Sequence, residues 1–335
     1  MSAAAVPVGI VGAGYFGGQH ARAIAALGGR LRVAAVASRT LAAASSLAGP
    51  GVRAYDDWRR LVEDRDVAAV CICTPHDLHE PVAVAAAQAG KAVLLEKPMA
   101  TSVVECDRII AAAARVPFMV AQPSRYMPAF ALARRVIADG RIGDPVHVRS
   151  PMIKAWLRDK RRPWHLDSAR GGGMWMTNGI HMVDRLCFLL GARPRAVSAS
   201  IGTQLHAAMA VDDIGVALYT FSGGRSGLVE AIGYAEGAPD HDCIVHGTKG
   251  MLRCHHADGL ALGQGERWTH IGARAENWVL DTLTGLWRDF LAHVDGAPSP
   301  IPGEEGRAHL AAVLAARDAA AEGRTITLTT DGTSP

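Results

Sequence analysis

The sequence predicts an α/β protein of two domains, in which a doubly wound parallel sheet is followed by a mainly antiparallel open sheet. Its 335 residues correspond to two domains at about 100 to 200 residues each. In the first third, short apolar runs alternate with alanine-rich helical stretches, as in a parallel sheet covered on both faces. After about Gln122 the strands become longer and more alternating, which is typical of antiparallel pairing.

Composition excludes several classes of protein. With 49% hydrophobic and 20% charged residues, the chain is neither disordered nor fibrous. A net charge of +3 is too small to indicate nucleic acid as a partner. No run approaches the roughly 20 apolar residues of a membrane span, and Met1–Pro7 does not resemble a secretory signal. Six cysteines without C-x-x-C pairs suggest reduced thiols, so we expect a cytoplasmic protein without a membrane partner.

The first domain is expected to span residues 1–122. Its predicted strands are Pro7–Val11, Leu31–Ala37, Ala68–Cys73, Ala92–Leu95 and Phe118–Ala121. Helices are predicted between them, near Gly17–Leu27, Leu41–Ala48, Trp58–Val62, Glu80–Ala89 and Val103–Ala114.

The second domain is expected to span residues 123–335. Its predicted strands are Val146–Pro151, Ala196–Gln204, Asp213–Ser222, Ser226–Tyr234, Asp242–His246 and Met251–His255. After a first helix, Pro128–Ala138, further helices are expected to cover this sheet near Met174–Leu190, Trp278–Val294 and Glu305–Glu322. A wide apolar sheet face exposed to water is unfavourable, so we expect a homodimer or homotetramer formed through the open sheet.

The segment Gly12-Ala13-Gly14-Tyr15-Phe16-Gly17 fits G-x-G-x-x-G between a predicted strand and a predicted helix. In a Rossmann fold the first Gly permits the tight turn. The second lets the backbone approach a pyrophosphate, and the third lets helix and strand pack closely. The amino end of the helix then offers unpaired N–H groups to the phosphates. The motif predicts a dinucleotide site that includes Gly12, Gly14, Tyr15, Phe16 and Gly17.

The end of the second strand bears on which dinucleotide binds. An NAD site usually places an acidic residue there, whereas this chain has Ser38-Arg39-Thr40. Without a carboxylate, a 2′-phosphate is not repelled, and Arg39 can pair with it or stack on adenine. We therefore expect NADP to be preferred over NAD. If Arg39 only packs on adenine, both cofactors bind.

Two further motifs follow later strands, at the edge where ligands bind in open sheets. The first contains four candidate cofactor contacts, which are Thr74, Pro75, His76 and His79 in the segment Thr74-Pro75-His76-Asp77-Leu78-His79. A structural role for His79 is at least as plausible. Glu96-Lys97-Pro98 follows the next strand. A buried Lys beside a nicotinamide is a plausible proton donor, and Glu96 is interpreted as structural within this cofactor-lining segment.

Together these motifs, GAGYFG, CTPHDLH and LLEKPMA in order, resemble the Gfo/Idh/MocA family, which includes relatives of glucose-fructose oxidoreductase and inositol dehydrogenase. The resemblance covers nearly the whole chain. It continues through Gly171-Gly172-Gly173, Gly179-Ile180-His181-Met182-Val183-Asp184 and the ending Arg307–Leu328.

The resemblance implies an NAD(P)-dependent oxidoreductase that moves hydride between nicotinamide and a carbinol or carbonyl carbon of a sugar, cyclitol or related cyclic polyol. It implies that Lys97 and His181 act at the reacting oxygen. Many members have an acidic residue four positions before this His, where this chain has Thr177. Helical spacing would place Thr177, His181 and Asp184 on one face. Thr177 could then orient a substrate hydroxyl, and Asp184 could fix the imidazole or pair with a nearby base.

The basic and aromatic segment 154–170 precedes the proposed active-site helix. Its candidate substrate contacts are Lys154, Trp156, Trp164 and His165, with less weight on the basic run Arg158–Arg162. A solvated loop or a subunit contact is the alternative.

No metal site is expected. Cys254-His255-His256 and His241-Asp242-Cys243 lack the spacing of a closed zinc site. Other functions stay open. The same chemistry could act on an aromatic cis-dihydrodiol or a cyclic imine, since methionines (Met152, Met174 and Met176) and two tryptophans lie near the predicted pocket. The fold could also serve as a non-catalytic regulator that senses NADP.

Overall fold

The computed structural model describes residues 4–156, 161–206, 209–272 and 275–328. The chain forms two compact units. One comprises the residues up to Pro123 together with Val279–Arg307, and the other comprises Ser124–Trp278 together with the residues from Ala308 onward. None of the described helices combines the length and apolar character needed to cross a bilayer.

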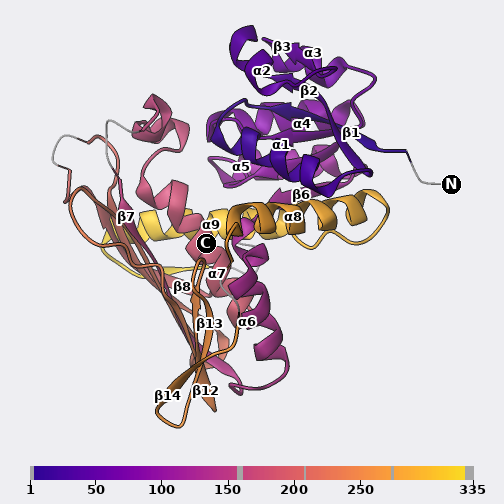
Figure 1. The fold of residues 1–335 in the computed structure, drawn as a ribbon. Coiled ribbons are helices and arrows are strands. Elements are labelled where there is room, and N and C mark those ends of the chain that lie inside the picture. Colours follow the sequence, from indigo (N-terminus) through magenta and orange to yellow (C-terminus); the bar gives the residue numbers. More distant parts are fainter. Residues whose placement is uncertain (1–3, 157–160, 207–208, 273–274, 329–335) are drawn as a thin grey trace. The chain divides into compact units, whose positions relative to one another are not determined.

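The first unit is built on a parallel sheet whose six described strands have the order β3-β2-β1-β4-β5-β6 (Figure 1). The strands are β1 (Val6–Val11), β2 (Leu31–Ala37), β3 (Arg53–Tyr55), β4 (Ala69–Ile72), β5 (Ala92–Glu96) and β6 (Phe118–Ala121). Every described residue of β4 and β5 is buried, as expected for central strands covered on both faces. The predicted parallel sheet is confirmed, and β3 is an addition to it.

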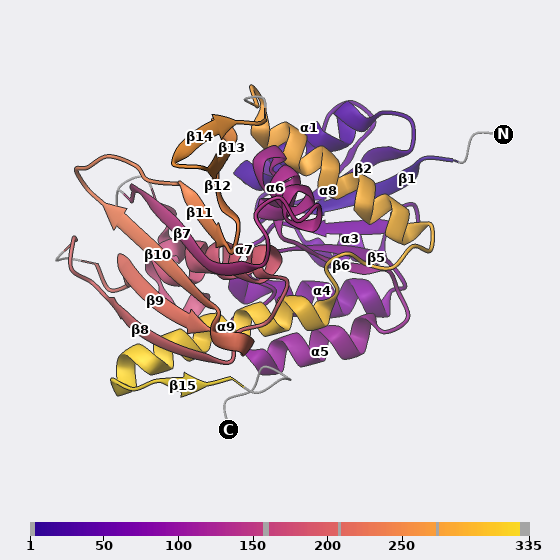
Figure 2. The ribbon, with the colours of Figure 1, turned by 90° about the horizontal axis from the view of Figure 1, so that it is seen from below.

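Helices cover both faces of this sheet. They are α1 (Tyr15–Leu27), α2 (Leu41–Leu47), α3 (Trp58–Glu63), α4 (His79–Gln88), α5 (Val103–Ala113) and α8 (Trp278–Val294). A Cβ at Gly9 would lie 2.6 Å from Leu61 of α3, whereas the next residue, Ile10, faces Gly17 of α1. Because successive strand residues point to opposite faces, α1 and α3 lie on opposite sides of the sheet. Helices α4 and α5 then lie side by side (Figure 2).

Helix α8 belongs to the first unit although it is distant in sequence, so the prediction that it covers the second sheet is wrong. Trp287 and Phe290 of α8 are 0% and 1% exposed. The indole N–H of Trp287 donates to His20 of α1, 3.0 Å away. An amphipathic pattern predicts the helix and its buried stripe, but it does not say which sheet the stripe covers.

The second unit contains a mainly antiparallel sheet whose nine described strands have the order β14-β13-β12-β11-β7-β10-β9-β8-β15. The strands are β7 (Pro145–Ala155), β8 (Ala196–Gly202), β9 (Ile214–Thr220), β10 (Ser226–Tyr234), β11 (Cys243–Gly247), β12 (Gly250–His255), β13 (Gly259–Gln264), β14 (Arg267–His270) and β15 (Ile326–Thr327). Strands β7 and β10 pair in parallel at the centre, and the other pairs are antiparallel.

Helices cover one face of this second sheet (Figure 1). They are α6 (Pro128–Ala138), α7 (Ile180–Leu190) and the part of α9 (Gly303–Glu322) that follows Arg307. Leu186 of α7 lies against Gly227 of β10, and the Tyr219 hydroxyl of β9 donates to the Ala312 carbonyl of α9. Side chains facing the helices, such as Val229 and Ala217, are 0% exposed. Their neighbours on the opposite face are half-buried or exposed.

Candidate functional site

The glycine turn after β1 is shaped by two close backbone approaches. A Cβ at Gly17 would lie 2.0 Å from the Gly12 carbonyl oxygen, and a Cβ at Gly12 would lie 2.5 Å from the Cys73 carbonyl oxygen. Gly12 also has a φ of +111°, in the region that favours glycine. The turn therefore requires glycine at both positions, as the motif predicts.

Helix α1 begins directly after this turn. Its N-cap residue, Gly14, has no side chain to accept a bond from the first N–H groups, and the first turn contains no acidic residue. Tyr15 and Phe16 are 65% and 42% exposed beside these groups. Unpaired N–H donors and the positive end of a 13-residue helix favour a phosphate group.

Neighbouring strands end at the same edge of the sheet. Thr74 follows β4, Lys97 follows β5 and Gln122 follows β6. Thr74 Oγ1 and Gln122 Oε1 are buried, and neither has a hydrogen-bond partner in the described part of the chain. A buried polar atom without a partner is costly, so each is a natural contact for a bound polar ligand. These two atoms and the open glycine turn fit a dinucleotide. Gln122 is absent from the predicted set because no motif marks it.

The segment after β2 has no carboxylate. Thr40 caps α2 by accepting a hydrogen bond from the Ala43 backbone N–H, 3.3 Å away. The Ser38 backbone N–H donates to the Tyr55 carbonyl, 3.0 Å away. Arg39 is exposed, and it forms no ion pair with any described carboxylate. Its guanidinium is therefore available to a ligand.

The imidazole of His79 is fully buried. Its Nδ1 lies 2.8 Å from the Pro98 carbonyl oxygen, and its Nε2 lies 3.0 Å from the Thr74 carbonyl oxygen. His79 therefore connects the loops after β4 and β5, which is the structural alternative given above. His76 is 4% exposed and lies edge-on to His79, and Pro75 precedes the short 3-10 turn that begins at His76.

Lys97 is 8% exposed at the end of β5. Burial lowers the pKa of its ammonium, while the Glu96 carboxylate raises it, with a net decrease. A lysine with a lowered pKa exchanges protons more readily near neutral pH. Glu96 is itself 6% exposed, and its carboxylate accepts a hydrogen bond from the Lys97 backbone N–H, 3.2 Å away.

His181 is the second residue of helix α7 in the second unit, which follows a π-helical segment at Trp175–Gly179. The expected α-helical spacing from Thr177 to His181 is therefore wrong, because a π turn contains more residues than an α turn. Both residues are nevertheless half-buried, whereas the residues between them are buried. Such π turns occur often at functional sites.

Asp184 does not share this accessible surface. Its carboxylate is 0% exposed and accepts a hydrogen bond from Arg125 Nε, 2.7 Å away. Burial raises the pKa of Asp184, while Arg125 lowers it, with a net rise. Asp184 is therefore not placed as a substrate contact. It forms a buried ion pair with Arg125, which is the alternative of pairing with a nearby base.

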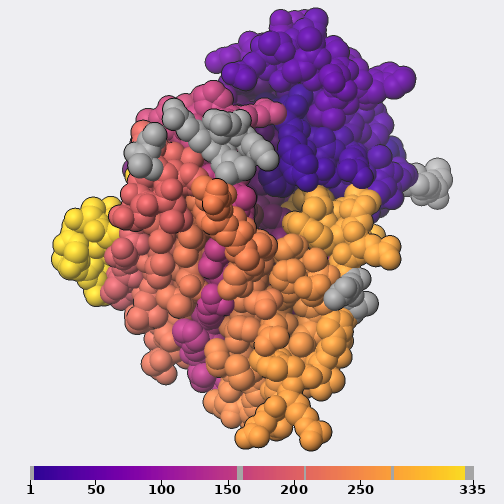
Figure 3. Space-filling view, turned by 60° about the vertical axis from the view of Figure 1, so that its left-hand side comes forward, coloured from indigo at the N-terminus to yellow at the C-terminus, as the bar shows by residue number. Residues whose placement is uncertain are grey.

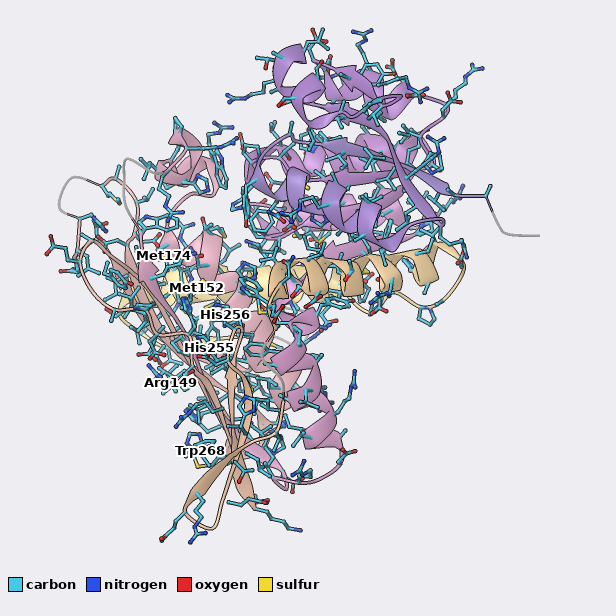
Figure 4. All side chains as sticks on the ribbon, in the orientation of Figure 1. Arg149, Met152, Met174, His255, His256 and Trp268 are labelled. Carbon is cyan, nitrogen blue, oxygen red and sulfur yellow. The ribbon has the colours of Figure 1, made fainter. Side chains whose placement is uncertain are left out.

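Lys154 of β7 is connected to the π-helical segment. Its Nζ donates to Asn178 Oδ1, 2.7 Å away, and Asn178 Nδ2 donates to the Met174 carbonyl, 3.3 Å away. Met152 and Met174 lie in the same region of the second unit (Figure 4). The structure therefore brings Lys154 to the segment that carries Thr177. Asn178 is a further polar residue of this group that no motif marks.

The tryptophans of segment 154–170 differ in exposure. Trp156 is 0% exposed, and its ring packs against Gly233 and under the Arg161 guanidinium. Its placement in the core argues against the predicted direct contact with substrate. Trp164 stacks on His165 with ring centroids 3.7 Å apart, and both are half-buried. Residues 157–160, which include part of the predicted basic run, lie outside the described residues.

The segments Cys254-His255-His256 and His241-Asp242-Cys243 lie side by side, because Cys243 of β11 pairs with Cys254 of β12. His241, His255 and His256 approach one another as rings on the second unit, where Figure 4 labels the latter two. Burial and Arg185 lower the pKa of His241 to about 4, so its ring is neutral at pH 7.

In the described part of the chain, only His20, Cys71 and Cys73 place three potential ligand atoms within 4.8 Å of one another. Both nitrogens of His20 are already hydrogen-bonded, Nδ1 to Trp287 and Nε2 to Glu96. A metal would have to displace one of these bonds, so we interpret the group as packing. His20 has a role that sequence reasoning missed, because it lies inside a helix with no recognisable motif.

The first unit thus has the fold and the strand-end site of a nicotinamide dinucleotide-binding protein, with a buried lysine at the same edge. Residues 6–122 match the model of the oxidoreductase family with an NAD-binding Rossmann fold, and residues 130–253 match a Gfo/Idh/MocA C-terminal domain. The chain belongs to the Gfo/Idh/MocA family of oxidoreductases.

Named relatives are similar over most of the chain. Inositol 2-dehydrogenase of Rhizobium meliloti is 30% identical, over 96% of this chain and 99% of that protein. Levoglucosan dehydrogenase of Pseudarthrobacter phenanthrenivorans is 29% identical, over 73% of this chain and 72% of that protein. The crystal structure of GenD2 from gentamicin A biosynthesis in complex with NAD has a TM-score of 0.85 and 26% identity, and the match covers 98% of each chain.

Replacement of Gly17 by Ala is expected to weaken dinucleotide binding at least about tenfold, a loss of roughly 1.4 kcal/mol. The new Cβ would meet the Gly12 carbonyl oxygen at 2.0 Å and push the turn open. Gly18→Ala is the matched control, because the nearest atom to its Cβ is 4.0 Å away. Dissociation constants from NADPH fluorescence titration measure the effect. Equal constants for the two variants would contradict this account of the turn.

Proposed function

We propose that the protein is a dehydrogenase or ketoreductase that transfers hydride between a nicotinamide cofactor and a carbinol or carbonyl carbon of a sugar, cyclitol or related cyclic polyol. The buried Lys97 at the cofactor edge of the sheet carries this proposal. A pure nucleotide sensor has no need of a buried amine with a lowered pKa at that position. The dehydrogenases among the relatives support the sugar or polyol class.

In this mechanism Lys97 exchanges a proton with the reacting oxygen. Its neutral amine accepts the hydroxyl proton during oxidation, and its ammonium returns the proton during reduction. His181 assists at the same oxygen, and Thr177 and Lys154 orient other hydroxyls of the substrate. The nicotinamide ring, when bound, supplies or accepts the hydride, while the chain supplies position and electrostatics.

Replacement of Lys97 by Met is expected to lower turnover by about 10²- to 10⁴-fold, the usual contribution of a positioned proton-transfer group. Dinucleotide affinity should stay near that of the unchanged protein, because Met fills a similar space. NADPH absorbance with a panel of cyclic polyols, sugars and their ketones gives the rates. Lys249→Met, at an exposed turn, is the control. Full activity of Lys97→Met would refute the assigned role.

The same panel separates the rival functions. Turnover only of aromatic cis-dihydrodiols or cyclic imines would replace the polyol class by one of these. NADP binding without turnover of any compound would favour the sensing regulator.

We also propose that NADP is preferred over NAD. The segment after β2 lacks the carboxylate that would bind the ribose 2′-hydroxyl and repel a 2′-phosphate. The exposed Arg39 can form charge-assisted hydrogen bonds with that phosphate. The complex of GenD2 with NAD shows that this structural relative binds NAD.

Replacement of Arg39 by Ala is expected to lower kcat/KM for NADP by about 10- to 100-fold, as for the loss of a charged hydrogen bond of about 1.5 to 3 kcal/mol. The value for NAD should change little. Arg32→Ala, exposed on the preceding strand, is the control. An equal loss with both dinucleotides would assign Arg39 to adenine stacking instead.

We further propose a homodimer or homotetramer formed through the open face of the second sheet. On this face no described helix covers β9 and β10, and Figure 3 shows strands of the second unit at the surface. Leu218 of β9 is 45% exposed there. A small-molecule substrate and a cytoplasmic location complete the proposal. All six cysteines are free thiols, which suits a reducing compartment.

Light scattering coupled to size exclusion is expected to give the mass of two or more 35.3 kDa chains. Leu218→Glu should shift the protein toward the monomer, because a charge would be buried in the contact. Leu41→Glu is the control, since Leu41 is 52% exposed on α2 of the first unit. A monomeric unchanged protein would contradict the proposal.

A further inference from the structure

A buried chain of hydrogen bonds leads from helix α8 to the residue before Lys97. Trp287 Nε1 donates to His20 Nδ1 over 3.0 Å, and His20 Nε2 lies 2.9 Å from Glu96 Oε1. The other carboxylate oxygen, Glu96 Oε2, accepts the Lys97 backbone N–H over 3.2 Å. Trp287 and His20 are 0% exposed, so water cannot replace either bond.

Trp287 fixes the direction of these bonds. An indole N–H can only donate, so His20 Nδ1 must keep its lone pair and the ring proton must lie on Nε2. His20 therefore donates to Glu96. Burial lowers the pKa of His20, while Cys73 and Glu96 raise it, with a net rise. The geometry opposes a second proton, however, because an N–H at Nδ1 would face the N–H of Trp287.

Glu96 would be costly as an isolated buried carboxylate. Burial raises its pKa, but the hydrogen bond from His20 and the charge of Lys97 lower it, with a net decrease. The carboxylate therefore stays ionised beside the Lys97 ammonium and opposes the effect of burial on that group. Without the hydrogen bond from His20, the Glu96 carboxylate would largely cease to offset the effect of burial on the Lys97 ammonium.

Two other titratable groups near these hydrogen bonds, Cys73 and His79, do not take over the role of His20 in keeping Glu96 ionised. Cys71 of β4 and Cys73, just after that strand, lie near His20, and a hydrogen bond to Cys71 and burial raise the pKa of the Cys73 thiol well above its usual value. That thiol is therefore neutral. From α4, burial lowers the pKa of His79, so this imidazole adds no positive charge near neutral pH.

We propose that His20 is a positioning residue of the active site: locked by Trp287 as a donor, it holds the Glu96 carboxylate ionised as the counter-charge that sets the proton affinity of Lys97. The inference rests on the proposed role of Lys97. It assigns a function to two buried residues on helices α1 and α8 that are not themselves placed at the substrate. It also gives the returning segment Val279–Arg307 a part in the chemistry of the first unit.

The effect of Glu96 on Lys97 is measured by NMR of [13C]Lys-labelled protein, which contains only five lysines. The Lys97 signal is assigned by its loss in Lys97→Met. In Glu96→Gln the midpoint of the Lys97 titration should fall by about one pH unit or more, because the ammonium loses its counter-charge. The low-pH limb of alcohol oxidation should move in the same direction. An unchanged midpoint would overturn the role of Glu96.

The effect of His20 is measured on [13C]Glu-labelled protein, with the Glu96 carboxyl carbon assigned from Glu96→Gln. In His20→Leu the Glu96 midpoint should rise by about one pH unit or more, since a buried carboxylate loses its donor. His20→Gln retains an N–H donor and should stay near the unchanged protein. An unchanged midpoint in His20→Leu would overturn the role of His20.

Two further variants keep the test decisive. Phe290→Leu alters the packing beside Trp287, whose ring centroid is 5.4 Å away, and should leave both midpoints unchanged. If His20→Leu does not fold, Trp287→Phe takes its place in the test. Phe has no N–H group to keep the His20 proton on Nε2, so the Glu96 midpoint should again rise. Neither titration requires turnover. Activity of Lys97→Met would overturn the proposed function, whereas unchanged titrations would overturn only this inference.

Discussion

The close approach of helix α1 to strand β1 is the constraint on which the first unit depends. Because Gly17 has no side chain, its Cα can lie against the Gly12 carbonyl, and the helix begins at the carboxyl edge of the sheet. The parallel strands then bring Thr74, Lys97 and Gln122 to the same edge. The packing of α1 and the parallel strands thus place an open helix end, a buried amine and two polar atoms that lack a partner among the described residues at one edge of the sheet.

Regular patterns made most of the fold predictable. Apolar runs bounded by turn residues located the strands that form the core of both sheets, and the glycine motif located the start of α1. Strand β3 escaped prediction because it has only three residues, none of them buried. The placement of α8 escaped because a helical stripe does not identify its partner, and the segment returns to the first unit only after strands β7 to β14 of the second sheet.

The site was predictable where motifs mark strand ends and less so where contacts are long-range. Arg39 and Lys97 follow from their position after a strand, but the pairing of Asp184 with Arg125 joins residues 59 positions apart. The spacing of residues in the sequence does not distinguish a π turn from an α turn, so the sequence predicts an α-helical face before His181. His20 lacks a motif, because its role depends on a tryptophan 267 positions away.

The central proposal is that Lys97, at the carboxyl edge of the first sheet, exchanges a proton with the oxygen that reacts beside the nicotinamide. A crystal structure of the protein with NADPH and a cyclic polyol tests it most directly. The proposal predicts the pyrophosphate over the Gly12–Gly17 turn and Lys97 Nζ within hydrogen-bond distance, about 2.6 to 3.2 Å, of the reacting hydroxyl. A dinucleotide bound elsewhere, or a Lys97 side chain that does not reach the substrate, would contradict it.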